Sequence, residues 1–151
     1  MPNAADVASA VGKGLFAGAA GTALMTVSST LEAKRTGRGS SSAPADAAGK
    51  VLGVQPRDEE GQARFSNAVH WGYGTGWGAV RGLIELTDPS PAAAAATHWA
   101  AVWGSSLVML PSLGVAPPVW KQPLAETALD AFHHLVYAGA TTAAWNAVGG
   151  G

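Results

Sequence analysis

The fold is decided by the uncharged stretch GLFAGAAGTALMTVSSTL, residues 14–31, which contains no Asp, Glu, Lys or Arg. Residues 65–80, 89–120 and 131–151 also lack these four residue types. Together these stretches make up more than half of the chain, whereas more than half of the formal charges lie between residues 32 and 64. A surface helix of a soluble domain needs a polar face, and a helix that crosses a bilayer needs about 20 predominantly apolar residues. The pattern therefore predicts a membrane protein.

The composition agrees with this prediction and excludes several kinds of site. Charged residues make up 13% of the chain, against roughly 25% in soluble proteins. The net charge of −1 provides no overall field that would attract nucleic acid. The absence of cysteine excludes disulfides, thiolate metal sites and a cysteine nucleophile.

Two alternatives to a multi-pass membrane protein follow from the same residues. The mean hydropathy is only +0.15, because Ala and Gly rather than Leu and Ile fill the apolar segments, so a soluble Ala-rich bundle is one alternative. A cleaved signal peptide is the other, since Lys13 precedes the apolar run. The length of that run, and the three apolar segments after it, favour a first transmembrane helix instead.

We expect an all-α fold, a single transmembrane domain over residues 1–151 that forms a four-helix bundle. The predicted helices cover residues 14–31, 65–86, 91–110 and 126–148. Pro91 suits the first turn of a helix, and the prolines after residue 110 interrupt helical structure. The polar loop 32–64 includes a Gly-, Ser- and Ala-rich patch at residues 37–49, which predicts irregular or mobile chain. The alternative is that part of it lies on the membrane surface.

A weak internal repeat suggests that the bundle consists of two tandem helical hairpins. The second predicted helix contains HWGYG at residues 70–74, and the fourth contains HLVYA at residues 134–138. The first and third share Gly-x-x-Leu, at residues 21–24 and 104–107. Chance similarity between Ala- and Gly-rich helices is the alternative explanation.

The distribution of Lys and Arg predicts the orientation in the membrane. Six of the nine fall in the first loop, namely Lys34, Arg35, Arg38, Lys50, Arg57 and Arg64, and Lys121 falls in the third. Cytoplasmic loops carry an excess of these residues. We therefore expect loops 32–64 and 111–125 to be cytoplasmic and both termini to lie outside.

Glycines spaced by four residues predict close helix packing. One pair is Gly14 and Gly18, and a longer series is Gly74, Gly78 and Gly82. Helix association in lipid gains little from the hydrophobic effect and depends on close backbone contact, which small residues allow. These five glycines are therefore candidate packing residues.

Polar side chains at spacings of three and four residues place a polar stripe on one face of the second and fourth helices. Ionisable groups within a membrane usually face the protein interior or a water-filled cavity. The inner candidate cluster, in the cytoplasmic half, consists of His70, Tyr73, Glu126, Asp130, His133, His134 and Tyr137. The outer candidate cluster consists of Arg81, Glu85 and His98, in which Arg81 and Glu85 are four residues apart and can pair.

Three interpretations of the inner cluster remain open. The first is a buried polar cluster that fixes the helix register and needs no cofactor. The second is a proton or ion path through histidines and carboxylates. The third is a haem b held by His70 and His134, from different helices at similar depth. Spacing alone does not decide whether His133 or His134 faces the interior.

No catalytic motif is present. The chain contains no CxxCH, no HExxH, no phosphate-binding GK[ST] loop and no GxGxxG after a strand. The glycines between residues 72 and 78 lie within a predicted helix and do not form a phosphate loop. The sequence therefore predicts a non-enzymatic protein.

The stretch LPSLGVAPPVW at residues 110–120, followed by Pro123, Glu126 and FHHLVY at residues 132–137, resembles the YagU-like family of uncharacterised bacterial inner-membrane proteins. The similar stretch covers about a fifth of the chain. His133 departs from the family pattern, in which a small residue is usual. The resemblance implies an integral inner-membrane protein with several helices and adds no mechanism.

The sequence as a whole predicts a small structural or accessory protein of a bacterial inner membrane, which packs through Gly-rich helix faces. Its partners would be the lipid bilayer, further copies of itself or a larger membrane complex, without nucleic acid. A small transporter or proton-conducting protein is the alternative, and a haem-binding redox subunit is the third possibility.

Overall fold

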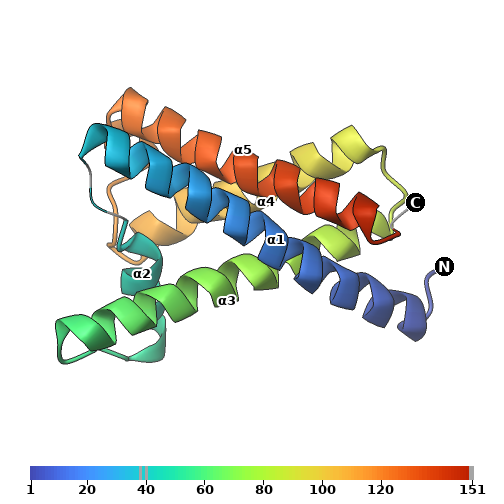
Figure 1. Ribbon diagram of the computed structural model, residues 1–151, viewed down its shortest axis with the longest axis horizontal. Coiled ribbons are helices and arrows are strands. Elements are labelled where there is room, and N and C mark those ends of the chain that lie inside the picture. Colours follow the sequence, from blue (N-terminus) through green and yellow to red (C-terminus); the bar gives the residue numbers. More distant parts are fainter. Residues whose placement is uncertain (38, 40, 150–151) are drawn as a thin grey trace.

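The computed structural model describes residues 1–37, 39 and 41–149, and in this part of the chain every regular element is a helix (Figure 1). The four long helices are α1 (Ala4–Thr36), α3 (Glu59–Glu85), α4 (Pro91–Ser112) and α5 (Leu124–Ala147). A short helix, α2, spans Ala43–Leu52, and a single 3-10 turn spans Val119–Lys121. The prediction of an all-α chain is confirmed.

Three of the four long helices begin before the predicted starts at residues 14, 65 and 126. In α1 and α3 a capping side chain, and not the apolar stretch, defines the start. The Asn3 side chain accepts hydrogen bonds from the backbone N–H groups of Ala5 and Asp6, and the Asp6 carboxylate accepts one from the N–H of Asn3. This capping box starts α1 at Ala4. The Asp58 carboxylate similarly accepts a hydrogen bond of 2.7 Å from the N–H of Gly61 and starts α3.

The helix ends differ less from the prediction. α1 continues past residue 31 to Thr36, with Lys34 and Arg35 in its last turn. Cations at this position interact favourably with the negative end of the helix dipole. Gly37, at φ 71°, then ends the helix in the left-handed conformation. α3 ends at Glu85, α4 at Ser112 and α5 at Ala147, against predicted ends at residues 86, 110 and 148.

The prediction of irregular or mobile chain over residues 37–49 was wrong for residues 43–49, which are helical. Residues 43–52 form α2, in which Pro44 occupies the first turn and Gly53, at φ 67°, ends the helix. The Gly and Ser residues of the patch lie mostly before Ser42, whereas the residues after it are rich in Ala, which favours helix formation. Treating the patch as one segment concealed this helix. Arg38, which was counted for the orientation, lies outside the described residues.

α1 is the central helix of the bundle. It crosses α3 and also packs along α5, while α4 packs against α5 and α3 from behind in the view of Figure 1. The connections α1–α3 and α4–α5 lie at one end of the molecule (the loop end), whereas the two termini and the α3–α4 turn lie at the opposite end (the terminal end). Ala10, Ala17 and Trp145 form a small apolar core between α1 and α5.

By length and composition, α1 is the one described helix that is long and apolar enough to be a candidate for crossing a membrane. The expectation of four spanning helices therefore needs support from the arrangement of the side chains.

Candidate functional site

The glycines predicted to pack lie where α1 and α3 cross. A Cβ atom added at Gly18 would lie 2.7 Å from the Cα of Gly78 and 2.8 Å from the carbonyl oxygen of Thr75. A Cβ added at Gly14 would meet the carbonyl oxygen of Gly78. The backbones of the two helices are therefore in direct contact, and only glycine fits at these positions.

The same interface continues in both directions along α3. A Cβ at Gly74 would meet the side chain of Thr22, and one at Gly82 would meet the carbonyl oxygen of Ala10. All five candidate packing glycines thus lie at a contact within the monomer.

A second close contact, between α1 and α5, was missed by the sequence analysis. A Cβ at Gly21 would meet the Oγ1 of Thr141 and would lie 2.9 Å from the carbonyl oxygen of Tyr137. The available signal was the position of Gly21 one turn after Gly18, which places a second small residue on a neighbouring face of α1.

The interior of the bundle consists of small and polar side chains. The buried apolar residues are mostly alanines, and the largest fully buried side chains are Arg81, His98, Thr22 and Thr141. The two threonine hydroxyls donate to carbonyl oxygens of their own helices, at Gly18 over 2.7 Å and at Tyr137 over 2.8 Å. These hydroxyls can therefore be buried without a partner on another helix.

The structure does not bring the inner candidate cluster together as one site. His70 of α3 contacts α1, where its Nε2 lies 2.8 Å from the Thr26 hydroxyl. That hydroxyl also donates to the carbonyl oxygen of Thr22 over 2.7 Å. Since a hydroxyl has only one hydrogen, both bonds form when the Nε2 of His70 carries the proton and donates to Thr26.

His133 and His134 face different neighbours. His133 is buried, and its Nδ1 lies 2.9 Å from the Ser28 hydroxyl of α1. His134 is more exposed, and its Nδ1 donates to the carbonyl oxygen of Asp130 in its own helix over 2.9 Å. His133 is therefore the histidine that faces the interior, on a different face of α5 from the one that carries His134.

The carboxylates of the inner cluster lie towards the surface. Asp130 accepts a hydrogen bond of 2.9 Å from the Nε1 of Trp103 in α4, and its side chain is half exposed. Glu126 is exposed, as is Tyr73, which packs edge-on against Trp77. Tyr137 is buried, and its hydroxyl donates to the carbonyl oxygen of Gly74. Residues grouped by depth in the sequence analysis therefore lie on different faces of the bundle, some buried and some exposed.

The described residues contain no group of three or more His, Asp or Glu side chains that could hold a metal ion. His70 and His134, the pair considered for haem, hydrogen-bond to α1 and to the α5 backbone respectively. No described contact joins them.

The outer candidate cluster contains a partly buried ion pair. Arg81 is fully buried, and its Nη1 donates to the Oε2 of Glu85 over 2.6 Å. Its Nε donates to the Thr142 hydroxyl over 3.2 Å, and its guanidinium carbon lies 5.3 Å from the centre of the Trp145 ring. The predicted pairing of Arg81 with Glu85 is confirmed, and α5 supplies the remaining contacts.

His98 lies beside this pair without bonding to it. Its Nε2 donates to the Trp77 carbonyl oxygen over 3.0 Å, and its ring centre lies 5.4 Å from that of Tyr137. Four buried polar atoms have no hydrogen-bond partner among the described atoms: Nη2 of Arg81, Nδ1 of His98, Nε2 of His133 and Nε1 of Trp145.

Large apolar side chains lie on the outside of the bundle. Phe16 and Leu24 of α1 are 63% and 55% exposed, and Val108 of α4 is 68% exposed. Further exposed members of this surface are Val27, Leu31, Leu83, Phe132 and Leu135. The bundle is thus small and polar inside and bulky and apolar outside, the reverse of a water-soluble core.

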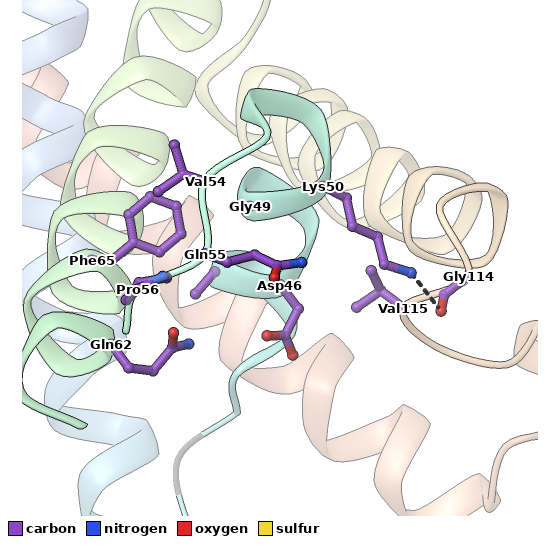
Figure 2. Close-up of a pocket in the computed structure, with 11 residues that line it drawn as sticks. Asp46, Gly49, Lys50, Val54, Gln55, Pro56, Gln62, Phe65, Gly114 and Val115 are labelled. Carbon is purple, nitrogen blue, oxygen red and sulfur yellow. Dashed lines mark hydrogen bonds between the residues drawn. The ribbon is translucent and has the colours of Figure 1, made fainter. Parts of the chain in front are cut away.

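An open cleft of about 390 Å³ lies at the loop end, between α2 and α3 (Figure 2). Asp46, Gln55 and Gln62 line it together with the ring of Phe65. Lys50 of α2 extends to residues 113–114, where its Nζ donates to the carbonyl oxygens of Leu113 and Gly114 over 2.7 and 3.2 Å.

Comparisons with protein-family models, with curated proteins and with solved structures find no match for this chain. The resemblance of residues 110–137 to the YagU-like family stays a prediction.

Proposed function

We propose that this chain is an integral protein of a bacterial inner membrane, with α1, α3, α4 and α5 crossing the bilayer. Its role would be non-enzymatic, as a structural or accessory component. The proposal depends on one observation, the placement of bulky apolar side chains outside the bundle and of small and polar ones inside. A monomeric protein in water rarely exposes apolar patches larger than a few hundred Å², whereas a lipid environment favours such a surface.

The manner of helix packing supports the same proposal. Helices in lipid associate through close backbone contact and interhelical hydrogen bonds. Both occur between α1 and its neighbours, as backbone contact at Gly14, Gly18 and Gly78 and as hydrogen bonds between α1 hydroxyls and the rings of His70 and His133. A soluble core of the same size would be expected to use Leu, Ile and Phe.

The ends of the molecule are consistent with a multi-pass arrangement. Lys34, Arg35, Lys50, Arg57 and Lys121 belong to elements at the loop end. By the excess of Lys and Arg in cytoplasmic segments, that end would face the cytoplasm and both termini would lie outside.

An accessory role fits the polar interior better than a catalytic one. Arg81 contacts Glu85, Thr142 and Trp145, and the buried hydroxyls of Thr22 and Thr141 bond to their own helices. The Ser28 hydroxyl lies 2.9 Å from the Nδ1 of His133, but the Nε2 of that ring has no hydrogen-bond partner among the described atoms, so no third group orients it as a catalytic base. The large apolar surface remains for lipid, for further copies of the chain or for a larger membrane complex.

The membrane proposal can be tested by single-cysteine labelling, because the chain has no cysteine of its own. Leu24→Cys and Leu135→Cys replace exposed apolar residues in the middle of α1 and α5, and Ser41→Cys serves as the matched control in the loop. In intact membranes we expect a water-soluble maleimide to modify residue 41 and to leave residues 24 and 135 unmodified. Equal labelling at all three positions, or recovery of the protein in the soluble fraction, would refute the proposal.

The accessory role needs a second measurement on protein purified in mild detergent. Intact-particle mass analysis should find either a homo-oligomer or a stoichiometric partner, and the absorption spectrum should lack a Soret band. A Soret band that shifts on reduction and is lost in His70→Ala would replace the accessory role with the redox alternative.

One observation favours the rival function of proton conduction. His98 and His133 are both buried with one ring nitrogen unpartnered among the described atoms, as a proton relay would require. Proton flux into liposomes that contain the purified protein, abolished in a folded His133→Gln variant, would establish this alternative.

A further inference from the structure

The end of α2 exposes two large apolar side chains. Val51 and Leu52 are 68% and 65% exposed. Val54, which follows the turn at Gly53, is 42% exposed and lines the cleft (Figure 2). We refer to Val51 and Leu52 as the α2 edge.

Two contacts determine the level of this edge along the bundle. Lys50 donates to the carbonyl oxygens of Leu113 and Gly114, which follow the last residue of α4. Figure 2 shows the bond to Gly114. On the other side, a Cβ at Gly49 would lie 3.8 Å from the ring of Phe65 in α3. The α2 edge therefore lies level with the point at which α4 ends.

Neighbouring residues at the loop end have the character of a membrane interface. Trp120 is 79% exposed and is followed by Lys121, and the exposed Leu124 begins α5. Trp is enriched at the level of lipid headgroups, and Lys can keep its ammonium group in water while its stem lies along apolar surface. The α2 edge and Trp120 both belong to segments at this end.

α2 also separates polar from apolar groups. Asp46 lines the cleft with Gln55 and Gln62, whereas Val51 and Leu52 are not among its lining residues. A short helix with one wet and one apolar side is suited to lie in the plane of the interface.

We infer that α2 lies in the interfacial layer of the bilayer at the loop end and inserts the α2 edge into lipid. This inference rests on the proposed membrane function, because it takes the end of α4 as the boundary of the hydrocarbon. The occupant is phospholipid and not a protein partner, since the edge lies level with the end of α4, at the end of the molecule that also carries the exposed Trp120 and Leu124 and the neighbouring Lys121.

The contact is apolar and does not depend on anionic headgroups. α2 carries one cation, Lys50, which is occupied by the carbonyl oxygens of residues 113 and 114, and one anion, Asp46. Insertion should therefore be the same in zwitterionic bilayers and in bilayers that contain anionic lipid.

The test uses a single environment-sensitive fluorophore in liposomes that contain the full chain. Val51→Cys and Leu52→Cys carry the label on the edge, and Asp46→Cys is the matched control on the cleft side of the same helix. Leu135→Cys reports on the spanning helix α5. Circular dichroism confirms that each labelled variant keeps its helix content.

We expect blue-shifted emission at residues 51 and 52, quenched by lipids that carry a nitroxide near the headgroup, and water-like emission at residue 46. The fluorophore at residue 135 should be quenched by lipids that carry a nitroxide deeper in the acyl chain. Quenching at 135 together with water-like emission at 51 and 52 would overturn the inference and leave the proposed function intact. Water-like emission at all positions would overturn both.

Two further outcomes would also overturn the inference. Blue-shifted emission at residues 51 and 52 without lipid quenching would mean that protein, a second copy or another subunit, covers the edge. Quenching that appears only when anionic lipid is added would mean that charge, and not the apolar edge, holds α2 at the membrane.

Discussion

The Tyr137 hydroxyl donates a hydrogen bond of 2.6 Å to the backbone carbonyl oxygen of Gly74 and so joins α5 to α3. Gly74 has no side chain to obstruct the approach, and its own neighbour on α1 is Thr22. The three helices that carry most of the packing thus meet within one turn of α3. This level of the bundle combines the glycine contacts with the buried polar groups.

We predict that Tyr137→Phe destabilises the protein by about 1 kcal/mol, because the ring is kept against His98 and one interhelical hydrogen bond is lost. The measurement is the melting temperature in mild detergent. Tyr73→Phe is the control, since Tyr73 occupies the equivalent position in the sequence repeat but is exposed. A loss of stability at position 73 as large as that at 137 would contradict this assignment.

Gly78→Ala and Gly76→Ala should have opposite effects although they lie on the same helix. A Cβ at Gly78 would lie 2.5 Å from the Cα of Gly18, so alanine forces α1 and α3 apart at a cost of about 1–3 kcal/mol. A Cβ at Gly76 meets nothing within 4 Å, and alanine there should stabilise the helix by up to about 1 kcal/mol.

Thermal unfolding of the two alanine variants in the same detergent decides this prediction. If Gly78→Ala were as stable as Gly76→Ala, the close α1–α3 contact would be absent from the protein in solution. Interhelical distances between spin labels on α1 and α3 would show directly whether the helices separate.

Removing Glu85 alone should cost more than removing the whole ion pair. Glu85→Ala leaves the fully buried Arg81 guanidinium without its carboxylate, which we expect to cost about 3 kcal/mol, at the lower end of the range because Glu85 is partly exposed. The double variant Arg81→Met, Glu85→Ala removes both charges and should recover part of that loss. A double-mutant cycle that compares the melting temperatures of both single variants and of the double variant measures the coupling between Arg81 and Glu85. Strict additivity of the two single changes would refute the prediction.

The adjacent histidines should respond differently to truncation. His133→Ala removes an interhelical contact to Ser28 and leaves a cavity, so a loss of about 1–3 kcal/mol is expected. His134→Ala removes a bond to its own helix backbone on the more exposed side and should change stability by less than about 0.5 kcal/mol. Equal losses of stability in the two variants would contradict the prediction, because both rings would then contribute to the packing of the interior.

Features that depend on spacing within one helix were predictable. Glycines four residues apart lie on one face at any position in the fold, so the packing role of Gly74, Gly78 and Gly82 followed from the sequence. The Arg81–Glu85 pair followed for the same reason, since residues four apart in a helix are neighbours. The contact of Gly21 with Thr141 depends on where α1 crosses α5, which spacing within either helix does not contain.

The sequence by itself determined that the chain is all-α, with its charges gathered between residues 32 and 64 and its small residues arranged for close packing. Only the tertiary structure decided which partner each polar group meets. His70 and His133 contact α1 at Thr26 and Ser28, while His134 bonds to its own helix. Adjacent residues point about 100° apart on a helix. The rotation of each helix about its axis therefore decides which of them is buried, and that rotation is set by the close contacts of α1 with α3 and α5.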